Sequence, residues 1–172
     1  TSIIYYAFAI SSGLFVLHVA IVFSAPDSLN SNAILITLAA LIISWVCQLL
    51  WWKRGAGLDK NPQSSPETAT QLTNTGKVRL LESPHSSPNY LMKEMVYTVG
   101  RKHAWKLKII SLIFGLALPA IILLICLFTK ASFLWLLIAC IDCFIGIFVS
   151  RWLFFAEAKH VVSHYYNTQF SA

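Results

Sequence analysis

The sequence predicts an all-α integral membrane protein: a helical bundle with four transmembrane helices and one basic amphipathic helix at the membrane surface. Hydrophobic residues make up 57% of the chain and charged residues only 12%, whereas a soluble domain has about 25% charged residues. The mean hydropathy is +0.67. Because a helix needs about 20 apolar residues to cross the hydrocarbon core, the expected spans are 3–23, 33–52, 109–128 and 133–155.

The first two spans are expected to form a hairpin over residues 1–52. They are joined by SAPDSLNSN, a short polar turn without a basic residue, which the positive-inside rule places outside the cell. The first span starts without a charged n-region or a cleavage site, so we do not interpret it as a signal peptide and expect the chain to begin inside a longer protein. His18 lies deep in this span, either as a histidine bonded to a nearby carbonyl or as an intramembrane functional group.

A long polar segment follows the first hairpin. Residues 53–87 are rich in Gly, Pro, Ser, Thr and Asn, which predicts a flexible linker. Residues 88–108 place apolar side chains on one helical face and charged ones largely opposite, which predicts a basic amphipathic helix leading into the third span. Such a helix either lies on the anionic leaflet or docks a partner subunit. The candidate docking residues are Lys93, Arg101, Lys102 and His103.

The second hairpin is expected over residues 109–172, with its two spans joined by TKAS. Pro119 should kink the third span. The fourth helix has no breaker until about Asn167, so its last turns should extend beyond the bilayer as a polar end. Basic residues flank the long loop, and this charge count places the loop and both termini in the cytoplasm.

The best candidate for chemistry is RWLFFAEAKHVVSHYYN, residues 151–167. Arg151 stands among apolar and aromatic residues, so its charge requires a partner, a cavity or the interface. Glu157, His160 and His164 follow at intervals of three and four residues, which places them on one helical face.

Asp142 is a carboxylate near the middle of the fourth span and requires a hydrogen bond or a wet cavity. With His18 it could form a proton path or the inner part of a quinone site, or the two could only specify the bundle through hydrogen bonds.

Several other sites are not expected. The motif CIDC has metal-pair spacing, but cysteines also pack as ordinary residues in membrane helices, and the four cysteines lie at different depths. A haem is disfavoured because His18 lies toward the short turns and His160 toward the basic side. The net charge of +6 fits the positive-inside pattern rather than nucleic-acid binding, and no motif for hydrolysis or phosphoryl transfer is present.

Two stretches, ESPHSSPNYLMKEMVYTVGRKHAWKLK (82–108) and RWLFFAEAKHVVSHYY (151–166), resemble the C-terminal half of the dimethyl sulfoxide reductase anchor subunit family. The resemblance implies a multi-pass subunit of the bacterial inner membrane. It would hold a molybdopterin catalytic subunit and an iron-sulfur subunit, oxidise menaquinol and pass electrons to the iron-sulfur subunit without a haem. Full members have about eight spans, so this chain would correspond to half of one.

For this role a quinol headgroup needs a proton acceptor, an apolar slot and an electron acceptor nearby. We assign Glu157 or His160 as the proton acceptor and Arg151 as the group that polarises a quinone oxygen or pairs with Glu157. The residues expected to bind the quinone are His18, Asp142, Trp152 and His164. The alternative is an interfacial belt of aromatic and snorkelling side chains.

Three alternatives stay open. The family topology places the last loop and the C-terminus in the periplasm, opposite to the charge count, and the basic helix would then dock the iron-sulfur subunit. The chain could instead be a purely structural or assembly protein that tethers a partner. It could also be half of a small transporter with Asp142 as its coupling site.

Overall fold

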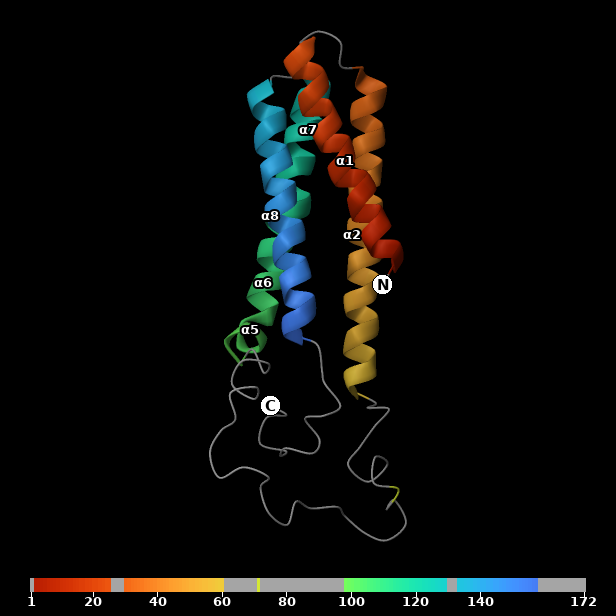
Figure 1. Cartoon of the computed structure of the whole chain (residues 1–172), viewed down its shortest axis with the longest axis vertical. Coiled ribbons are helices and arrows are strands. Elements are labelled where there is room, and N and C mark those ends of the chain that lie inside the picture. Colours follow the sequence, from red (N-terminus) through yellow and green to blue (C-terminus); the bar gives the residue numbers. More distant parts are fainter. Residues whose placement is uncertain (1, 26–29, 61–70, 72–97, 130–132, 158–172) are drawn as a thin grey trace.

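The computed structural model describes residues 2–25, 30–60, 71, 98–129 and 133–157 and shows an antiparallel bundle of long helices (Figure 1). The helices are α1 (Ser2–Ser24), α2 (Ser31–Lys60), α5 (Thr98–Lys102), α6 (Ala104–Leu112), the π-helical turn η1 (Ile113–Ala117), α7 (Leu118–Phe128) and α8 (Phe133–Glu157). The ends of α1 and α7 and the starts of α2 and α8 lie at one end of the bundle. The ends of α2 and α8 and the start of α5 lie at the other, which we call the basic end.

The four predicted spans are confirmed. Helices long and apolar enough to cross a membrane cover Ser2–Ser24, Ser31–Ala56, Ala104–Phe128 and Phe133–Glu157. Large apolar side chains cover their outer surfaces, among them Phe23, Phe128 and Phe148, which are 73% to 85% exposed. An outward face of this kind is stable in contact with lipid, so the chain is a multi-pass membrane protein by its architecture.

Two of the expected boundaries change. α2 continues through Lys60, so residues 53–60 are helical and do not belong to a flexible linker. The extension is possible because the first proline after the span is Pro62, and glycines weaken a helix without ending it. In the amphipathic segment, the structure describes only α5 and α6, which His103 separates with a non-helical ψ of 12°.

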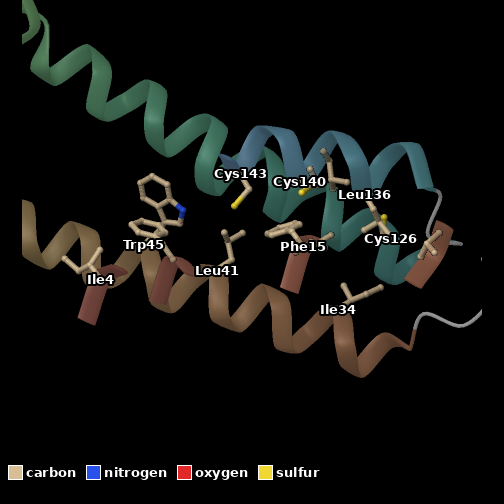
Figure 2. Packing of buried hydrophobic residues seen from close by; sticks show 14 residues of the cluster. Ile4, Phe15, Ile34, Leu41, Trp45, Cys126, Leu136, Cys140 and Cys143 are labelled. Carbon is tan, nitrogen blue, oxygen red and sulfur yellow. The ribbon is translucent and has the colours of Figure 1, made fainter. Parts of the chain in front are cut away.

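The core is a narrow line of apolar side chains between α1, α2, α7 and α8 (Figure 2). Phe15, Leu41, Trp45, Leu123 and Leu136 are its largest fully buried members. The free cysteines at 126, 140 and 143 lie in the same cluster as packing residues. Among the described residues no group of three His, Cys, Asp or Glu side chains could hold a metal ion.

The third span is interrupted where Pro119 was expected to kink it, and the irregularity takes the form of η1. Pro119 has no backbone N–H, so it cannot donate to the carbonyl of Gly115, the residue four positions earlier. The indole Nε1 of Trp45 donates to that carbonyl at 2.7 Å. A side chain of α2 therefore stabilises the irregular turn in the third span.

Two glycines bring η1 and α8 into close contact. A Cβ atom at Gly146 would lie 2.2 Å from the Cα and the backbone N of Gly115, and one at Gly115 would lie 2.1 Å from Cζ2 of Trp45. The side chain of Trp45, the backbone of η1 and the backbone of α8 are thus stacked without room for another atom. The Gly146–Gly115 contact sets the distance between the two helices of the second hairpin, and the Gly115–Trp45 contact sets the distance of η1 from α2.

Candidate functional site

Arg151 lies on α8 near the basic end, and its side chain contacts α1 and α2. Its guanidinium carbon is 5.0 Å from the ring centre of Tyr5, 5.3 Å from that of Phe8 and 6.0 Å from that of Phe154. α1 begins part-way along α2 in Figure 1, so its first turns reach only to this depth. The faces of aromatic rings attract a cation, so these three rings are the first partners of the Arg151 charge.

Gln48 is the polar partner of Arg151. It lies on α2 and is fully buried, and its Oε1 accepts a hydrogen bond from Nη2 of Arg151. The same Nη2 is 3.4 Å from Oγ of Ser150. The orientation of the amide follows from chemistry, since an arginine has only donors and must face the oxygen.

Two nitrogen atoms of this pair remain without a hydrogen-bond partner. Nε2 of Gln48 and Nε of Arg151 are both buried, and neither has an acceptor within the part of the chain that the structure describes. A buried donor without an acceptor is costly, and native proteins usually satisfy such groups with water, an ion or a ligand. Both atoms are enclosed by the protein, so they do not by themselves form a binding site.

An apolar groove along α8 ends at Arg151. Its volume is about 470 Å³ and it is lined by Phe144, Ile145, Ile147, Phe148, Val149 and Arg151. The groove is open toward the lipid side of the bundle, because Phe144, Ile145 and Phe148 are exposed. The groove is therefore suited to an apolar chain.

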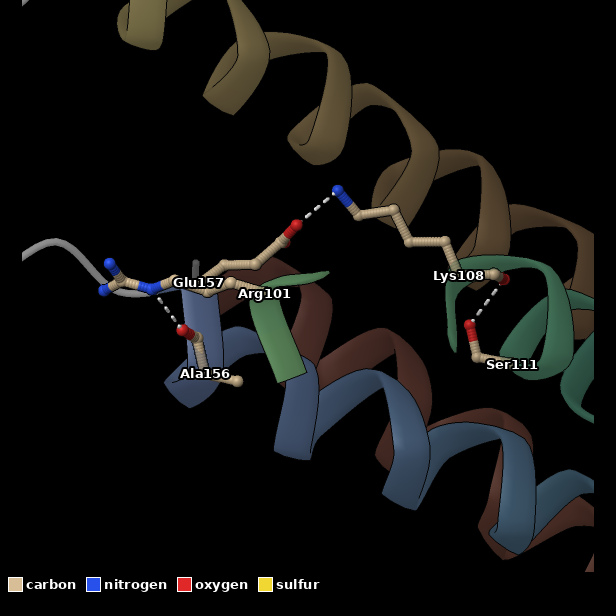
Figure 3. Close-up of polar contacts among 5 residues, drawn as sticks. All are labelled: Arg101, Lys108, Ser111, Ala156 and Glu157. Carbon is tan, nitrogen blue, oxygen red and sulfur yellow. Dashed lines mark hydrogen bonds and ion pairs between the residues drawn. The ribbon is translucent and has the colours of Figure 1, made fainter. Parts of the chain in front are cut away.

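Glu157 does not pair with Arg151. Its Oε1 is 2.6 Å from Nζ of Lys108 on α6 (Figure 3), and Nζ also lies 5.6 Å from the ring centre of Trp52. Glu157 follows Arg151 by six positions, which turns its direction by about 240° around the helix and separates the two side chains. The expected alternative of an Arg151–Glu157 pair is therefore wrong.

The partner-docking candidates Arg101 and Lys102 differ in their surroundings. Nε of Arg101 donates to the carbonyl oxygen of Ala156 at 3.1 Å, so this side chain binds the last turn of α8 in its own chain (Figure 3). Cations near a helix C-terminus are stabilised by the exposed carbonyls there. Lys102 is exposed, whereas His103 is half-buried and lies between α5 and α6.

α5 also approaches α8 closely at Gly100. A Cβ atom at Gly100 would lie 2.9 Å from Cη2 of Trp152 and 3.3 Å from Cβ of Ala156. Trp152, expected at the quinone site, therefore packs against α5. It follows Arg151 directly and points about 100° away from it around the helix.

His18 is bonded within the first hairpin and does not belong to the Arg151 site. Its Nδ1 is 2.7 Å from the carbonyl oxygen of Leu14, and its Nε2 is 3.2 Å from Oγ1 of Thr37. Since a carbonyl only accepts, Nδ1 carries a proton. His18 lies ten residues beyond Phe8, or about 15 Å along α1. The structure shows the bonding of His18 to a nearby carbonyl, and the expectation that it joins the quinone-binding group stays a prediction.

Asp142 is half-buried and makes no hydrogen bond or ion pair with any residue in the described ranges. It is not brought together with His18, and it precedes Arg151 by nine residues, or about 13 Å along α8. It therefore lies outside the site formed by Arg151 and Gln48.

Three candidates, Lys93, His160 and His164, lie outside the described residues. The sequence reasoning missed Gln48 as a site residue and did not assign Lys108 as the partner of Glu157. Gln48 could have been found as a polar residue in an otherwise apolar stretch, four residues before Trp52. Nothing in the local pattern indicates the Lys108–Glu157 pairing, because it depends on how α6 packs on α8.

Comparison of the chain with protein-family models, with curated proteins and with solved structures finds no match.

Proposed function

We propose that the chain is a membrane anchor subunit of a dimethyl sulfoxide reductase-type molybdopterin oxidoreductase and that it oxidises menaquinol at Arg151. The observation that carries the proposal is the position of Arg151, a charged side chain among the lining residues of an apolar groove on a lipid-facing helix. A quinone has an apolar tail that suits the groove and oxygen atoms that a guanidinium can polarise.

The charges of the site suit the headgroup. The positive charge of Arg151 is stabilised by the rings of Tyr5, Phe8 and Phe154 and by the amide of Gln48. Among the described residues no carboxylate pairs with it. Such a guanidinium can polarise an oxygen that carries partial negative charge. Four spans of lipid-facing helix hold this group close to the basic end, where a soluble electron acceptor would dock.

The reaction requires an exit for protons as well as for electrons. Oxidation of one quinol breaks two O–H bonds, releases two protons and delivers two electrons to the iron-sulfur subunit. Glu157 and His160 are the proposed proton acceptors, Glu157 in its ion pair with Lys108 at the margin of the bundle. The electrons then continue to the molybdopterin subunit.

The docking surface for these subunits is proposed at the basic end. Lys53, Arg54, Lys102 and Lys106 are exposed there, and they would attract an acidic protein surface. Arg101 contributes indirectly, because its bond to Ala156 holds α5 against α8.

The test measures quinol-dependent turnover of the complete complex in membranes. Arg151→Gln, Glu157→Gln and His160→Ala should each reduce quinol oxidation by roughly 100-fold, the usual scale for one proton-transfer or charge-stabilising group. Attachment of the catalytic subunits and their turnover with a soluble reductant should be retained. Ser24→Ala, an exposed substitution at the opposite end of the bundle, is the control and should oxidise quinol at the wild-type rate.

Unchanged quinol oxidation in Arg151→Gln would refute the site. A purely structural tether is the second candidate, and it is favoured by the contacts that Lys108 and Arg101 make with α8 of their own chain. On that alternative, substitution of Lys93, Arg101 and Lys102 would release the partner subunits, and Arg151→Gln would leave the electron transfer of the complex unaltered.

A further inference from the structure

We propose that two copies of this chain associate in the membrane through the outer face of α8, with their two Asp142 carboxyl groups hydrogen-bonded to each other. The proposal goes beyond quinol oxidation and does not depend on it. It starts from Asp142, a carboxyl group that the proposed reaction does not use. Within the described residues this side chain has neither a hydrogen bond nor an ion pair.

Asp142 lies near the middle of the bilayer. Trp135 and Trp152 are exposed near the two ends of α8, where tryptophans are expected at the two membrane interfaces. Asp142 is seven residues from the first and ten from the second, or about 10 Å and 15 Å along the helix. The short side chain of an aspartate cannot extend that far to reach water, so the carboxyl group requires a partner within the membrane.

The surface around Asp142 has the spacing of a helix–helix contact. Trp135, Ile138, Asp142 and Ile145 follow one another at intervals of three and four residues, which places them along one face of α8. The three apolar members are 42% to 50% exposed, and Asp142 is half-buried beside them. In paired helices, a single polar residue within an apolar seam of this kind fixes which residues face each other.

A second copy of the chain supplies the partner that Asp142 requires. Two copies inserted in the same direction and related by a two-fold axis along the membrane normal place identical residues opposite each other at one depth. A neutral carboxyl group has one O–H donor and one carbonyl acceptor, so two such groups form two reciprocal hydrogen bonds. The pair carries no charge and therefore avoids the cost of a charge in hydrocarbon.

This association is compatible with the groove that ends at Arg151. Arg151 follows Asp142 by nine positions, which turns its direction by about 180° around α8, so the second copy would cover the face opposite to Arg151. Ile145 belongs both to the seam and to the lining of the groove, which consists of α8 residues. The second copy would therefore add a wall along one side of the groove.

The test measures self-association of the full chain in a bilayer. One pool of the chain carries a donor dye at its amino terminus and a second pool carries an acceptor dye, and both are reconstituted into phosphatidylcholine vesicles at decreasing protein-to-lipid ratios. We expect energy transfer in the wild type that falls as the protein is diluted in lipid. The measurement requires neither quinone nor catalytic subunits, so its outcome is independent of the proposed function.

Two substitutions of Asp142 examine the carboxyl pair. Asp142→Leu removes both hydrogen-bonding groups at similar size and should raise the protein-to-lipid ratio at half-association about tenfold, the effect of two hydrogen bonds within a membrane. Asp142→Asn retains a donor and an acceptor, and it should associate within about threefold of the wild type.

A matched pair of substitutions examines the face of α8. Ile138→Trp inserts a bulky ring into the seam and should weaken association severalfold. Ile42→Trp is its control, because Ile42 is exposed to the same extent, 47% against 45%, but lies on α2. This variant should associate as the wild type does.

Three results would overturn the proposal. The first is a wild type without energy transfer at the highest protein-to-lipid ratio. The second is association of Asp142→Leu that equals that of the wild type, because the carboxyl groups would then not join the copies. The third is association of Asp142→Asn as weak as that of Asp142→Leu, which would mean that Asp142 pairs with a cation instead of a second carboxyl group.

Discussion

Substitution of Gly146 by alanine tests whether the backbone contact between α8 and η1 holds the two helices of the second hairpin together. The added Cβ atom would lie 2.2 Å from the Cα and the backbone N of Gly115 and 2.8 Å from the carbonyl oxygen of Ser111. All three neighbours are backbone atoms, so no side chain can rotate away. Since carbon atoms are in ordinary contact at about 3.5–4.0 Å, the helices must separate by more than about 1 Å.

The neighbours of η1 resist this separation. Gly115 lies directly against the ring of Trp45, whose Nε1 donates to its carbonyl oxygen at 2.7 Å. A shift of η1 away from α8 would drive it into Trp45, and a shift of α8 would open the contact along the whole hairpin. Overpacking of this kind costs about 1–3 kcal/mol, and we expect the upper part of that range because the obstructing atoms belong to the backbone.

Gly13→Ala is the matched control. Gly13 is also a glycine within a membrane-spanning helix, but a Cβ atom there meets no atom within 4 Å. Both substitutions replace glycine by alanine in a helix, which by itself stabilises by roughly 0.5–1 kcal/mol. The difference in unfolding free energy between the two variants therefore isolates the steric cost at Gly146, about 2–3 kcal/mol.

The assay is reversible unfolding in mixed micelles with increasing SDS, followed by circular dichroism. Gly146→Ala should unfold at a lower SDS fraction than the wild type, and Gly13→Ala at an equal or higher one. If Gly146→Ala and Gly13→Ala have the same unfolding free energy, the close approach of α8 and η1 does not stabilise the second hairpin.

Two further predictions use the same unfolding assay. Trp45→Phe keeps an aromatic ring but removes the donor to the carbonyl of Gly115, and Pro119 cannot replace that donor. The substitution should therefore lower the unfolding free energy by about 1–3 kcal/mol. A loss below about 0.5 kcal/mol would show that the bond contributes little. Glu157→Gln removes a partly exposed ion pair with Lys108 and should cost less than about 1 kcal/mol. A much larger loss would mean that lower quinol oxidation in this variant reflects unfolding instead of a missing proton acceptor.

The membrane-spanning architecture could be predicted because hydropathy and length are local properties. Each of the four apolar stretches identifies its own helix, and the short turns between them require antiparallel neighbours. The same local reasoning predicts that the second helix ends at Trp52, because the apolar run ends there. The helix itself continues through Lys60, since hydrogen bonding of the backbone does not stop where hydrophobic residues do.

The partners of the polar residues could not be predicted in this way. Arg151 was expected to need a partner because a charge in an apolar environment requires one. Its partner, Gln48, is 103 residues away in sequence and lies on a different hairpin. Likewise, Glu157 was grouped with residues of its own helical face, but its ion pair is formed with Lys108 because α6 packs against α8.

By itself, the sequence determined that this protein is an all-α membrane bundle and that Arg151 is a charge that requires compensation. Both conclusions follow from the free energy of moving individual side chains out of water. Only the tertiary structure decided that an amide and three aromatic rings compensate it. The physical reason is that hydrogen bonds and cation–π contacts depend on distances of a few ångströms. Those distances are set by helix packing at Gly115, Gly146 and Trp45 rather than by sequence spacing.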